Sequence, residues 1–389
     1  MKAGWQLLRL GAVCEFDKSQ GIHAGLPYVG LEDIESQTAR FIGSEEPQVV
    51  KSSTFKFSTQ HVLYGRLRPY LNKVLAPEFT GHCSTEIFPI KPSPALSREY
   101  LLYWFLSDET VGRINATCTG ARMPRADMNE VLDFDFPFPP LPEQQRIVTL
   151  LDEAFDGIAT AKANAGKNLQ NARGIFESHL QSVFTQRGDG WIDRSLGELA
   201  VFRNGINFTK SSAGEPIKIL GVKDFRSSYW APLEDLETVI PDGALGDLDM
   251  LQRDDLVFVR SNGNPELIGR CLLVGEVTEK TTHSGFTIRA RLNGSQLIPT
   301  YLCHFLKSNI VRREMIDGGN GANIRSLNQG TLSRLVIPVP PTSAQAQIVS
   351  QLEDIDRVTK RLETIYQQKL TALDELKKSL LHRAFSGRL

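Results

Sequence analysis

The segment PPLPEQQRIV (residues 139–148) recurs 201 residues later as PPTSAQAQIV (residues 340–349). The same offset aligns residues 82–188 with residues 283–389 and requires no gap. Identities continue on both sides of the repeated segment, so the likeness extends well beyond one short motif. An internal repeat of this length predicts one structural frame that is present twice.

The two copies differ in length ahead of the repeated segment. Three residues near the N-terminus match the start of the second copy at an offset of 186, so the second copy gains 15 residues within its first hundred positions. A repeated frame with unequal inserts suggests one scaffold that presents two different surfaces. The matched residues are Trp5, Leu10 and Gly11 with Trp191, Leu196 and Gly197, and, in the ungapped part, His82 with His283 and Ile87 with Ile288.

Length and composition indicate an ordinary soluble protein of two or three domains. The chain has 389 residues, of which 41% are hydrophobic and 23% are charged. It contains no run of about 18 apolar residues that would span a membrane, and its N-terminus lacks the apolar core of a signal peptide. The five cysteines are widely spaced, which argues against a disulfide framework or a zinc site. We therefore expect a cytoplasmic protein.

Each copy ends in a segment whose apolar residues recur every three or four positions, the spacing of a coiled-coil seam. About 40 residues at 1.5 Å each form a helix of roughly 60 Å. One seam is rich in alanine and the other in leucine, so we expect the two helices to pack as an antiparallel pair with pseudo-two-fold symmetry. An ordinary helical hairpin is the simpler alternative. The predicted seam residues are Ile147, Leu151, Ala154, Ile158, Ala161, Ala165, Leu169, Ala172, Phe176, Leu180 and Val183, and then Ile348, Leu352, Ile355, Val358, Leu362, Tyr366, Leu370, Leu373, Leu376, Leu380 and Ala384.

The part of each copy that precedes the long helix is predicted to be a mixed α/β domain. Short apolar runs broken by Gly, Pro and Asn indicate strands at residues 62–64, 256–259 and 271–274, and short helices are expected at 100–106 and 301–306. Each domain ends in a proline-rich exit, FPFPPLP (136–142) or IPVPP (337–341). Because proline lacks an amide donor, we expect these exits to be stiff hinges that continue neither a strand nor a helix.

The predicted fold class is α+β, with two tandem mixed α/β domains separated by a long antiparallel two-helix coiled coil in a pseudo-two-fold internal repeat. The expected boundaries are 1–142 for the first domain, 143–187 for the first helix, 188–341 for the second domain and 342–389 for the second helix.

The chain contains no recognisable catalytic motif. It lacks GxxxxGK[ST], HExxH and GxSxG, and no GxGxxG follows a predicted strand. Asn264-Pro265-Glu266 is the nearest approach to the Asn/Asp-Pro-Pro-aromatic signature of amino-methyltransferases, and it does not match. His82 and His283 lack an evident nucleophile or carboxylate partner, so a structural role is favoured over general-base catalysis. A stand-alone methyltransferase or nuclease is therefore disfavoured.

Basic residues are concentrated locally although the formal net charge is −1. Three windows, at residues 61–73, 112–125 and 318–334, contain arginine or lysine and no acidic residue. Such windows are usually solvated loops, but their recurrence at matching places in both copies favours a functional role. The near-neutral total argues weakly against nucleic-acid binding unless the charge is unevenly placed along the chain.

The repeated segment PPLPEQQRIV closely resembles the conserved region of type I restriction-modification specificity subunits, and PPTSAQAQIV is its weaker echo. The second hinge departs from the pattern, with Ser343 and Ala344 where the first has Pro142 and Glu143. Four further segments look like that family's target-recognition domains. They are LYGRLRPYLNKV (63–74), CSTEI (83–87), RSNGNPELIGRCLLV (260–274) and GANIRSLNQGTL (321–332).

This resemblance implies a non-catalytic subunit that reads double-stranded DNA. Each recognition domain would read one half of a bipartite site, and the helical pair would set the spacing between the halves. The implied partners are two methyltransferase subunits and the restriction and translocase subunits of a prokaryotic host-defence complex. No cofactor is expected on this chain, since S-adenosylmethionine, ATP and Mg would be bound by the partners. The specificity subunit of a type II cutting-and-methylating system, or a protein-binding structural adaptor, remains an alternative.

Arginine is the natural bidentate reader of guanine, and asparagine is that of adenine. On this basis we expect some basic-loop residues to contact phosphates and others to contact base edges. The Asn262–Asn264 stretch also fits an ordinary turn. The candidate DNA-binding residues are Arg66, Arg68, Lys73, Arg122 and Arg125 in the first copy and Arg260, Asn262, Asn264, Arg270, Asn323, Arg325 and Asn328 in the second.

Overall fold

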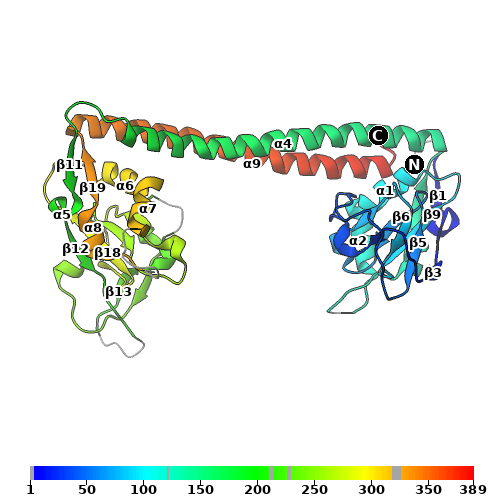
Figure 1. Ribbon diagram of the computed structural model, residues 1–389, viewed down its shortest axis with the longest axis horizontal. Helices are drawn as coiled ribbons and strands as arrows, with labels where there is room; N and C mark the ends of the chain where they lie inside the picture. The colour runs from blue at the N-terminus through cyan, green and yellow to red at the C-terminus, as the bar shows by residue number, and fades with distance from the viewer. Residues whose placement is uncertain (1–3, 121, 210–213, 226–228, 318–325) are drawn as a thin grey trace. The chain divides into compact units, whose positions relative to one another are not determined.

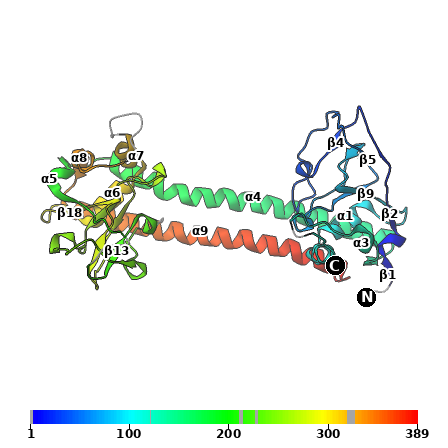
Figure 2. The ribbon, with the colours of Figure 1, turned by 90° about the horizontal axis from the view of Figure 1, so that it is seen from below.

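The computed structural model describes residues 4–120, 122–209, 214–225, 229–317 and 326–389. The chain divides into two compact units, one comprising residues 1–167 with 366–389 and the other comprising residues 168–365. Each unit holds a mixed α/β domain and part of two long helices, which are α4 (Leu141–Thr185) and α9 (Thr342–Phe385). The predicted fold class is confirmed: the mixed domain occurs twice, and α4 packs on α9 (Figures 1 and 2).

The domain of the first unit is built from short strands and helices. Their bounds are β1 (Gln6–Arg9), β2 (Cys14–Phe16), β3 (Gln20–Gly21), β4 (Tyr28–Val29), β5 (Thr54–Phe57), β6 (Val62–Gly65), β7 (Val74–Leu75), β8 (Gly81–Cys83), β9 (Ile87–Pro92), α1 (Arg98–Leu106), α2 (Asp108–Ala116), α3 (Met128–Leu132) and β10 (Asp135–Phe138). The strands form sheets of order β2-β9-β6-β7 and β3-β5-β8-β4 and a separate pair, β1-β10.

The domain of the second unit repeats this plan. Its elements are β11 (Ile192–Ser195), α5 (Leu196–Leu199), β12 (Ala200–Asn204), β13 (Ile217–Leu220), β14 (Glu237–Val239), β15 (Leu256–Val259), β16 (Cys271–Leu273), β17 (Thr281–His283), β18 (Thr287–Leu292), α6 (Pro299–Lys307), α7 (Asn309–Asp317), α8 (Gln329–Arg334) and β19 (Val336–Val339). The sheets have the orders β12-β18-β15-β16, β14-β13-β17 and β11-β19. The predicted strands at 62–64, 256–259 and 271–274 are therefore confirmed, the last ending one residue earlier, and so are both predicted short helices.

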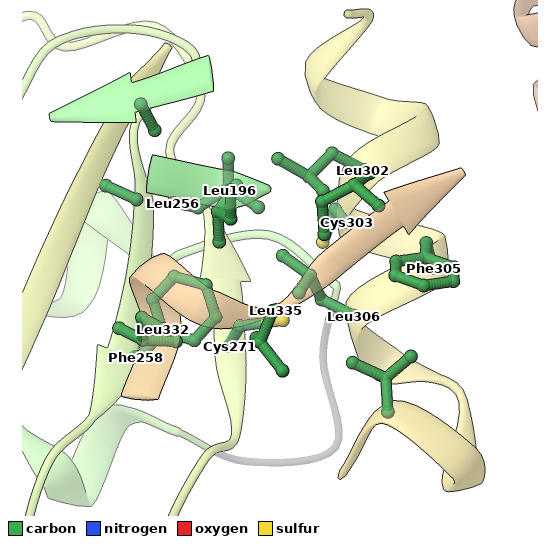
Figure 3. Packing of buried hydrophobic residues seen from close by; sticks show 14 of the residues in the cluster. Leu196, Leu256, Phe258, Cys271, Leu302, Cys303, Phe305, Leu306, Leu332 and Leu335 are labelled. Carbon is green, nitrogen blue, oxygen red and sulfur yellow. The ribbon is translucent and has the colours of Figure 1, made fainter. Parts of the chain in front are cut away.

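The main core of each unit joins its domain to the long helices. In the second unit, Phe258 and Cys271 from the sheet belong to one buried cluster with Leu302 and Phe305 from α6 (Figure 3). Leu352 of α9 belongs to the same buried cluster. In the first unit, Ile147 and Leu151 of α4 and Leu381 and Ala384 of α9 are buried with Tyr100 of α1. Burial of these apolar side chains stabilises the contact between each domain and its part of the helix pair.

The two long helices run antiparallel within each unit. In the first unit Lys162 Nζ lies 2.6 Å from Asp374 Oδ1, and in the second unit Arg173 Nε lies 3.1 Å from Glu363 Oε2. In the first unit Leu151 of α4 also shares a buried cluster with Leu381 of α9, and in the second unit Leu180 shares one with Leu352, so within each unit residue numbers rise along one helix as they fall along the other. Seven of the eleven predicted seam residues of α4 are buried, namely Ile147, Leu151, Ile158, Ala165, Leu169, Ala172 and Leu180. The other four, Ala154, Ala161, Phe176 and Val183, are half-buried.

The predicted seam of α9 is wrong at two positions. Val358 is 57% exposed and Leu376 is 46% exposed, whereas the neighbouring Thr359 is buried. Because a helix has 3.6 residues per turn, the inward residue after Ile355 can lie either three positions on, at Val358, or four positions on, at Thr359. The prediction chose the apolar residue, but the polar one is buried. Thr359 is tolerated because its hydroxyl donates to the Ile355 carbonyl at 2.9 Å. Lys377 lies inward in place of Leu376, with its ammonium 5.1 Å from the Phe155 ring centroid.

The prediction that the proline-rich exits cannot continue a strand is also wrong. Pro137 lies in β10 and Pro338 lies in β19, each in a two-stranded antiparallel pair. Tyr100 Oη donates to the Pro137 carbonyl at 3.1 Å, and Tyr301 Oη donates to the Pro338 carbonyl at 2.6 Å. The backbone polar atoms of one strand residue point to the same side, so each proline nitrogen also faces away from its partner strand. An edge strand tolerates proline in this orientation.

A buried glutamine fixes the start of each long helix. Gln144 accepts a hydrogen bond from Ser97 N (2.8 Å) and donates to the carbonyls of Ala95 and Pro139 (3.1 and 2.8 Å). Gln345 forms the same three bonds, with the following partners: Ile298 N (2.7 Å), the Gln296 carbonyl (2.9 Å) and the Pro340 carbonyl (2.9 Å). Both side chains are fully buried. The repeated amide thus satisfies backbone groups that would otherwise be buried without partners.

The hydrogen-bonded turns correct the ungapped alignment of the two copies. Ser84 N donates to a carbonyl of β4 and its hydroxyl accepts from Glu86 N, and Ser284 makes the matching bonds with Leu220 of β13 and Phe286 N. These serines are 200 residues apart, whereas Tyr100 and Tyr301 are 201 apart. One residue is therefore inserted between β18 and α6. His82 and His283 are identical but occupy adjacent, non-equivalent positions of the frame.

Candidate nucleic-acid interface

The backbone brings two predicted DNA-binding loops of the first domain together. Leu67 forms a β-bridge with Arg125, and Arg68 N donates to the Pro124 carbonyl at 2.7 Å. The Arg66 carbonyl accepts from Ala126 N at 2.9 Å. Arg66 and Arg68 from the window 61–73 and Arg125 from the window 112–125 therefore belong to one surface.

Glu86 holds two of these arginines. Arg66 Nε lies 3.0 Å from Glu86 Oε2, and Arg125 Nη2 lies 2.8 Å from Glu86 Oε1. Burial raises the pKa of Glu86, but hydrogen bonds and the positive charges of Arg125 and Arg66 outweigh burial and lower it overall. The carboxylate therefore stays ionised at neutral pH and fixes both guanidinium groups.

Arg68, Tyr70 and Arg122 are exposed on this surface, as is the apolar Met123. Arg68, with a φ of 52°, and Asn72, with a φ of 43°, both adopt the left-handed backbone conformation, so the chain turns sharply at each end of this loop. Asn72 is buried, and its amide donates to the Phe105 carbonyl at 3.1 Å. The loop is thus anchored at its base while its tip remains exposed.

Lys73 and Arg270 have equivalent roles inside their own domains. Lys73 Nζ donates to the carbonyls of Leu31 and Ile34 at 2.7 and 2.8 Å. Ile34 directly follows a 3-10 turn, Leu31–Asp33. In the second domain Arg270 Nη1 donates at 3.4 Å to the carbonyl of Phe225, which directly follows the matching turn, Val222–Asp224. Each cation precedes the strand that closes the loop, β7 or β16. Both side chains brace the loop from within, and their contact with DNA stays a prediction.

The second domain builds the same frame with different side chains. Arg260 N donates to the Phe286 carbonyl at 2.8 Å, the Arg260 carbonyl accepts from Leu327 N at 2.7 Å, and Ser261 bridges Ser326. Arg260 therefore takes the place of Arg66. Phe286 takes the place of Glu86, and Ser326 takes that of Arg125. Without a carboxylate at this point, Arg260 Nη1 donates to the Gly285 carbonyl at 3.3 Å.

The asparagines predicted to contact DNA also shape the loop. Asn262 Oδ1 accepts from Asn264 N at 2.8 Å, and Asn264 Oδ1 accepts from Glu266 N at 3.0 Å. This is the turn that the sequence suggested as their alternative role. Asn328 Oδ1 accepts from Thr331 N at 2.8 Å and caps α8. Asn323 and Arg325 lie outside the described residues, so their predicted role stays a prediction.

Two residues at the centre of this comparison, Glu86 and Phe286, were not among the predicted site residues. Glu86 lies in the segment CSTEI, and an acidic residue was disregarded because the prediction sought basic windows. The ungapped alignment paired Glu86 with Thr287, which hid its replacement by an exposed phenylalanine. Aligning the copies by the repeated serine turn would have revealed both residues.

The two histidines are buried within the domains and suit a structural role. His82 Nδ1 lies 2.9 Å from Thr54 Oγ1, and His283 Nδ1 lies 2.9 Å from Thr287 Oγ1. Burial lowers the pKa of His82, and burial with the nearby charge of Arg289 lowers that of His283 to about 3. Both rings are therefore neutral at physiological pH.

The described residues contain neither a metal-binding cluster nor a membrane-spanning helix. Across 4–120, 122–209, 214–225, 229–317 and 326–389, no three histidine, cysteine or acidic side chains are grouped as a metal would require. Within the same described ranges, no helix is both long and apolar enough to cross a membrane.

Comparison with known proteins identifies a family. Residues 3–167 and 266–372 match the model of the type I restriction modification DNA specificity domain. The chain is 24% identical over 328 residues to the type I restriction enzyme StySPI specificity subunit of Salmonella potsdam. It is 24% identical over 330 residues to the EcoKI specificity subunit of Escherichia coli strain K12. Each alignment covers 77% of this chain and 67% of the relative.

Solved structures share the fold over the whole chain. A chain from a structure described as the basis of assembly and conformational transition of the type I R-M system has a TM-score of 0.81 at 19% identity, covering 100% of this chain and 99% of that chain. The HsdS subunit from Thermoanaerobacter tengcongensis has a TM-score of 0.69 at 19% identity and covers 100% and 98%. These likenesses agree with the internal repeat and the paired helices described above.

Proposed function

Because this chain belongs to the type I restriction-modification specificity family, we propose that it reads a bipartite DNA site, one half with each mixed domain. The observation that carries this proposal is the repeated loop frame with exchanged side chains. The same backbone bonds bring together the loops around Arg66 and Arg260, but one domain presents Glu86 and Arg125 where the other presents Phe286 and Ser326. One frame with two sets of contacting groups suits recognition of two different sequences.

In the first half-site, the exposed Arg68 and Arg122 contact phosphates or base edges. Arg66 and Arg125 are oriented by Glu86, and a guanidinium in fixed orientation suits bidentate recognition of guanine. In the second half-site, Arg260, Asn262 and Asn264 are the principal candidates. Lys73, Arg270 and Asn328 contribute chiefly by holding the loops in shape, since each already bonds to backbone groups of its own domain.

The helix pair sets the distance between the half-sites and docks two methyltransferase subunits. The chain itself is non-catalytic in this proposal. The partners bind S-adenosylmethionine, ATP and Mg, and the restriction and translocase subunits join the same cytoplasmic complex. A formal net charge of −1 supports a need for those partners, because phosphate neutralisation supplies most non-specific DNA affinity. We expect weak, salt-sensitive DNA binding by the isolated chain.

The decisive experiment compares Arg260→Ala with wild type in the complex reconstituted with its methyltransferase partners. The bipartite site is first identified by methylation mapping, and binding is then measured on duplexes altered in one half at a time. Loss of Arg260 should cost about 1–3 kcal/mol and relax only the second half-site. Arg253→Ala is a matched control, because Arg253 is an exposed arginine of the same domain that pairs with Glu276. Equal relaxation of both halves would exclude the assignment of domains to half-sites.

A further inference from the structure

An open cavity lies beside the second domain's candidate DNA-binding loop. Its volume is about 510 Å³, and it is lined by β13, β14, the 3-10 turn Val222–Asp224 and three loops. Asn262 and Gly263 form part of its wall, so the cavity adjoins a loop already assigned to the second half-site. The apolar residues in the wall are Phe208, Ile219, Val222 and Phe286.

Two aromatic side chains of this cavity are exposed. Phe286 is 61% exposed and Phe208 is 39% exposed, although phenylalanine is ordinarily buried. Phe286 occupies the turn between β17 and β18, where its amide donates to Ser284 Oγ at 3.3 Å. Its carbonyl accepts from Arg260 N and Ser261 N. These backbone hydrogen bonds fix Phe286 in the turn next to Arg260, and in this position the phenyl ring is exposed.

The polar groups of the cavity suit an uncharged ligand surface. Lys223 and Glu237 both line it and form an ion pair with each other, so neither charge is left alone. Asn262 commits one oxygen lone pair to Asn264 N, and within the described residues its amide nitrogen has no hydrogen-bond acceptor. The cavity therefore offers aromatic surface together with one amide that retains a donor and an acceptor lone pair.

The position equivalent to Phe286 in the first domain carries a charged side chain instead of an apolar one. Glu86 stands where Phe286 stands, and it is bound by Arg66 and Arg125. The Arg66 guanidinium also lies 5.3 Å from the Phe88 ring centroid. An ionic group occupies the position in one domain, and an exposed apolar ring occupies it in the other.

We infer that the cavity bounded by Phe286, Phe208 and Asn262 recognises an A·T pair in the second half-site by receiving the 5-methyl group of thymine. This inference rests on the proposed function and assigns the chemistry of one contact within it. The thymine methyl is the apolar feature of the major groove, and phenylalanine is a known partner for it. The Asn262 amide can pair with N6 and N7 of the adjacent adenine edge. In the first domain the Glu86 ion pairs offer a methyl group no apolar surface, and contact would remove water from the charged groups, so we assign the methyl contact to the second half-site alone.

The test removes the methyl group alone. In the reconstituted methyltransferase complex, each thymine of the second half-site is replaced singly by deoxyuridine, and equilibrium affinity is measured. At one position the wild type should bind the uracil duplex about three- to tenfold more weakly. Phe286→Ala should bind thymine and uracil duplexes equally at that position. Phe286→Leu, which keeps an apolar side chain, should retain part of the discrimination.

The controls separate failure of this inference from failure of the proposed function. Ile240→Ala alters another exposed apolar residue of the second domain, 45% exposed and outside the cavity, and should retain full discrimination. If the wild type binds its mapped site specifically but no uracil substitution matters, the methyl contact is refuted while the proposed function stands. If Phe286→Ala weakens binding to the thymine and uracil duplexes by the same factor, so that the preference for thymine persists, the ring does not read the methyl group and the inference also fails. Absence of any sequence-specific binding would overturn the proposed function itself.

Discussion

The two mixed domains share the groups that hold the backbone and differ in the groups that the loops display. Gln144 and Gln345 make the same three hydrogen bonds, and Tyr100 and Tyr301 donate to equivalent proline carbonyls. At the loop surface, by contrast, Glu86 is replaced by an exposed phenylalanine. Satisfying buried backbone groups constrains the frame, whereas a solvent-facing side chain is free to change with the ligand.

The first prediction tests whether the frame is equivalent in the two units. Gln144→Met and Gln345→Met keep the side-chain volume but leave one amide and two carbonyls without partners. Each substitution should destabilise its own unit by about 2–4 kcal/mol. Hydrogen exchange measured by mass spectrometry would report each unit separately.

The exposed Gln181 of α4 provides the control for this pair. Gln181→Met should change stability by less than about 0.5 kcal/mol. A large effect of one buried substitution beside a negligible effect of the other would show that the repeat has the same geometry but not the same energetics.

The second prediction concerns the proline-containing edge strands. Tyr100→Phe and Tyr301→Phe remove the donor to Pro137 or Pro338 and should each cost about 0.5–1.5 kcal/mol. Urea unfolding of the full chain would measure the loss of stability. Tyr70 is half-exposed, so Tyr70→Phe is a control that should leave the free energy of unfolding unchanged. If neither buried tyrosine mattered, solvent would already be satisfying the proline carbonyls.

How far the fold could be predicted is best seen in the alanine-rich and leucine-rich helices. Their three-and-four spacing identified both helices and most inward residues, because burial of apolar surface is a local pattern in the sequence. Val358 and Thr359 were assigned the wrong way round, because adjacent residues both satisfied the spacing and hydrophobicity favoured the exposed one. The prolines were misjudged because their tolerance depends on a distant tyrosine and on which strand edge lies open.

The candidate site was predictable only in outline. Arg66, Arg68 and Arg125 were identified as basic loop residues, and the structure brings them together. Their common partner Glu86 was missed, since an ion pair between residues 20 and 39 positions apart leaves no periodic trace. Lys73 and Arg270 could not be told apart from exposed cations, because their carbonyl partners become neighbours only in the folded sheet.

The third prediction concerns the ion pairs that Glu86 forms in the first domain and that Phe286 cannot form in the second. Because the folded-state pKa of Glu86 is lowered, its stabilisation is present above its unfolded pKa of about 4.3 and is lost as pH falls through the folded value. Glu86→Gln should remove this part of the acid dependence. The difference should stay below about 1 kcal/mol, because the pair is partly solvated.

The free energy of unfolding, measured for both proteins as the pH is lowered from about 6 through the range in which carboxylates titrate, would give this difference. Phe286→Gln is the matched variant in the other domain and should leave the acid dependence unchanged, since no carboxylate is altered. Identical pH profiles for wild type and Glu86→Gln would show that the two arginines do not stabilise the folded carboxylate.

The fourth prediction, with the smallest expected effect on stability, tests whether Val358 lies outside the helix seam, as observed, or within it, as the sequence predicted. Val358→Gln should change the free energy of unfolding by less than about 0.5 kcal/mol, because this side chain is already 57% exposed. Leu352→Ala, at a fully buried position of the same helix, should cost about 2–5 kcal/mol. If Val358 did lie in the seam, its replacement by a polar residue would cost at least about 1.5 kcal/mol. A result of that size would require α9 to be rotated about its axis relative to the burial described here, and Thr359 would then become the exposed residue.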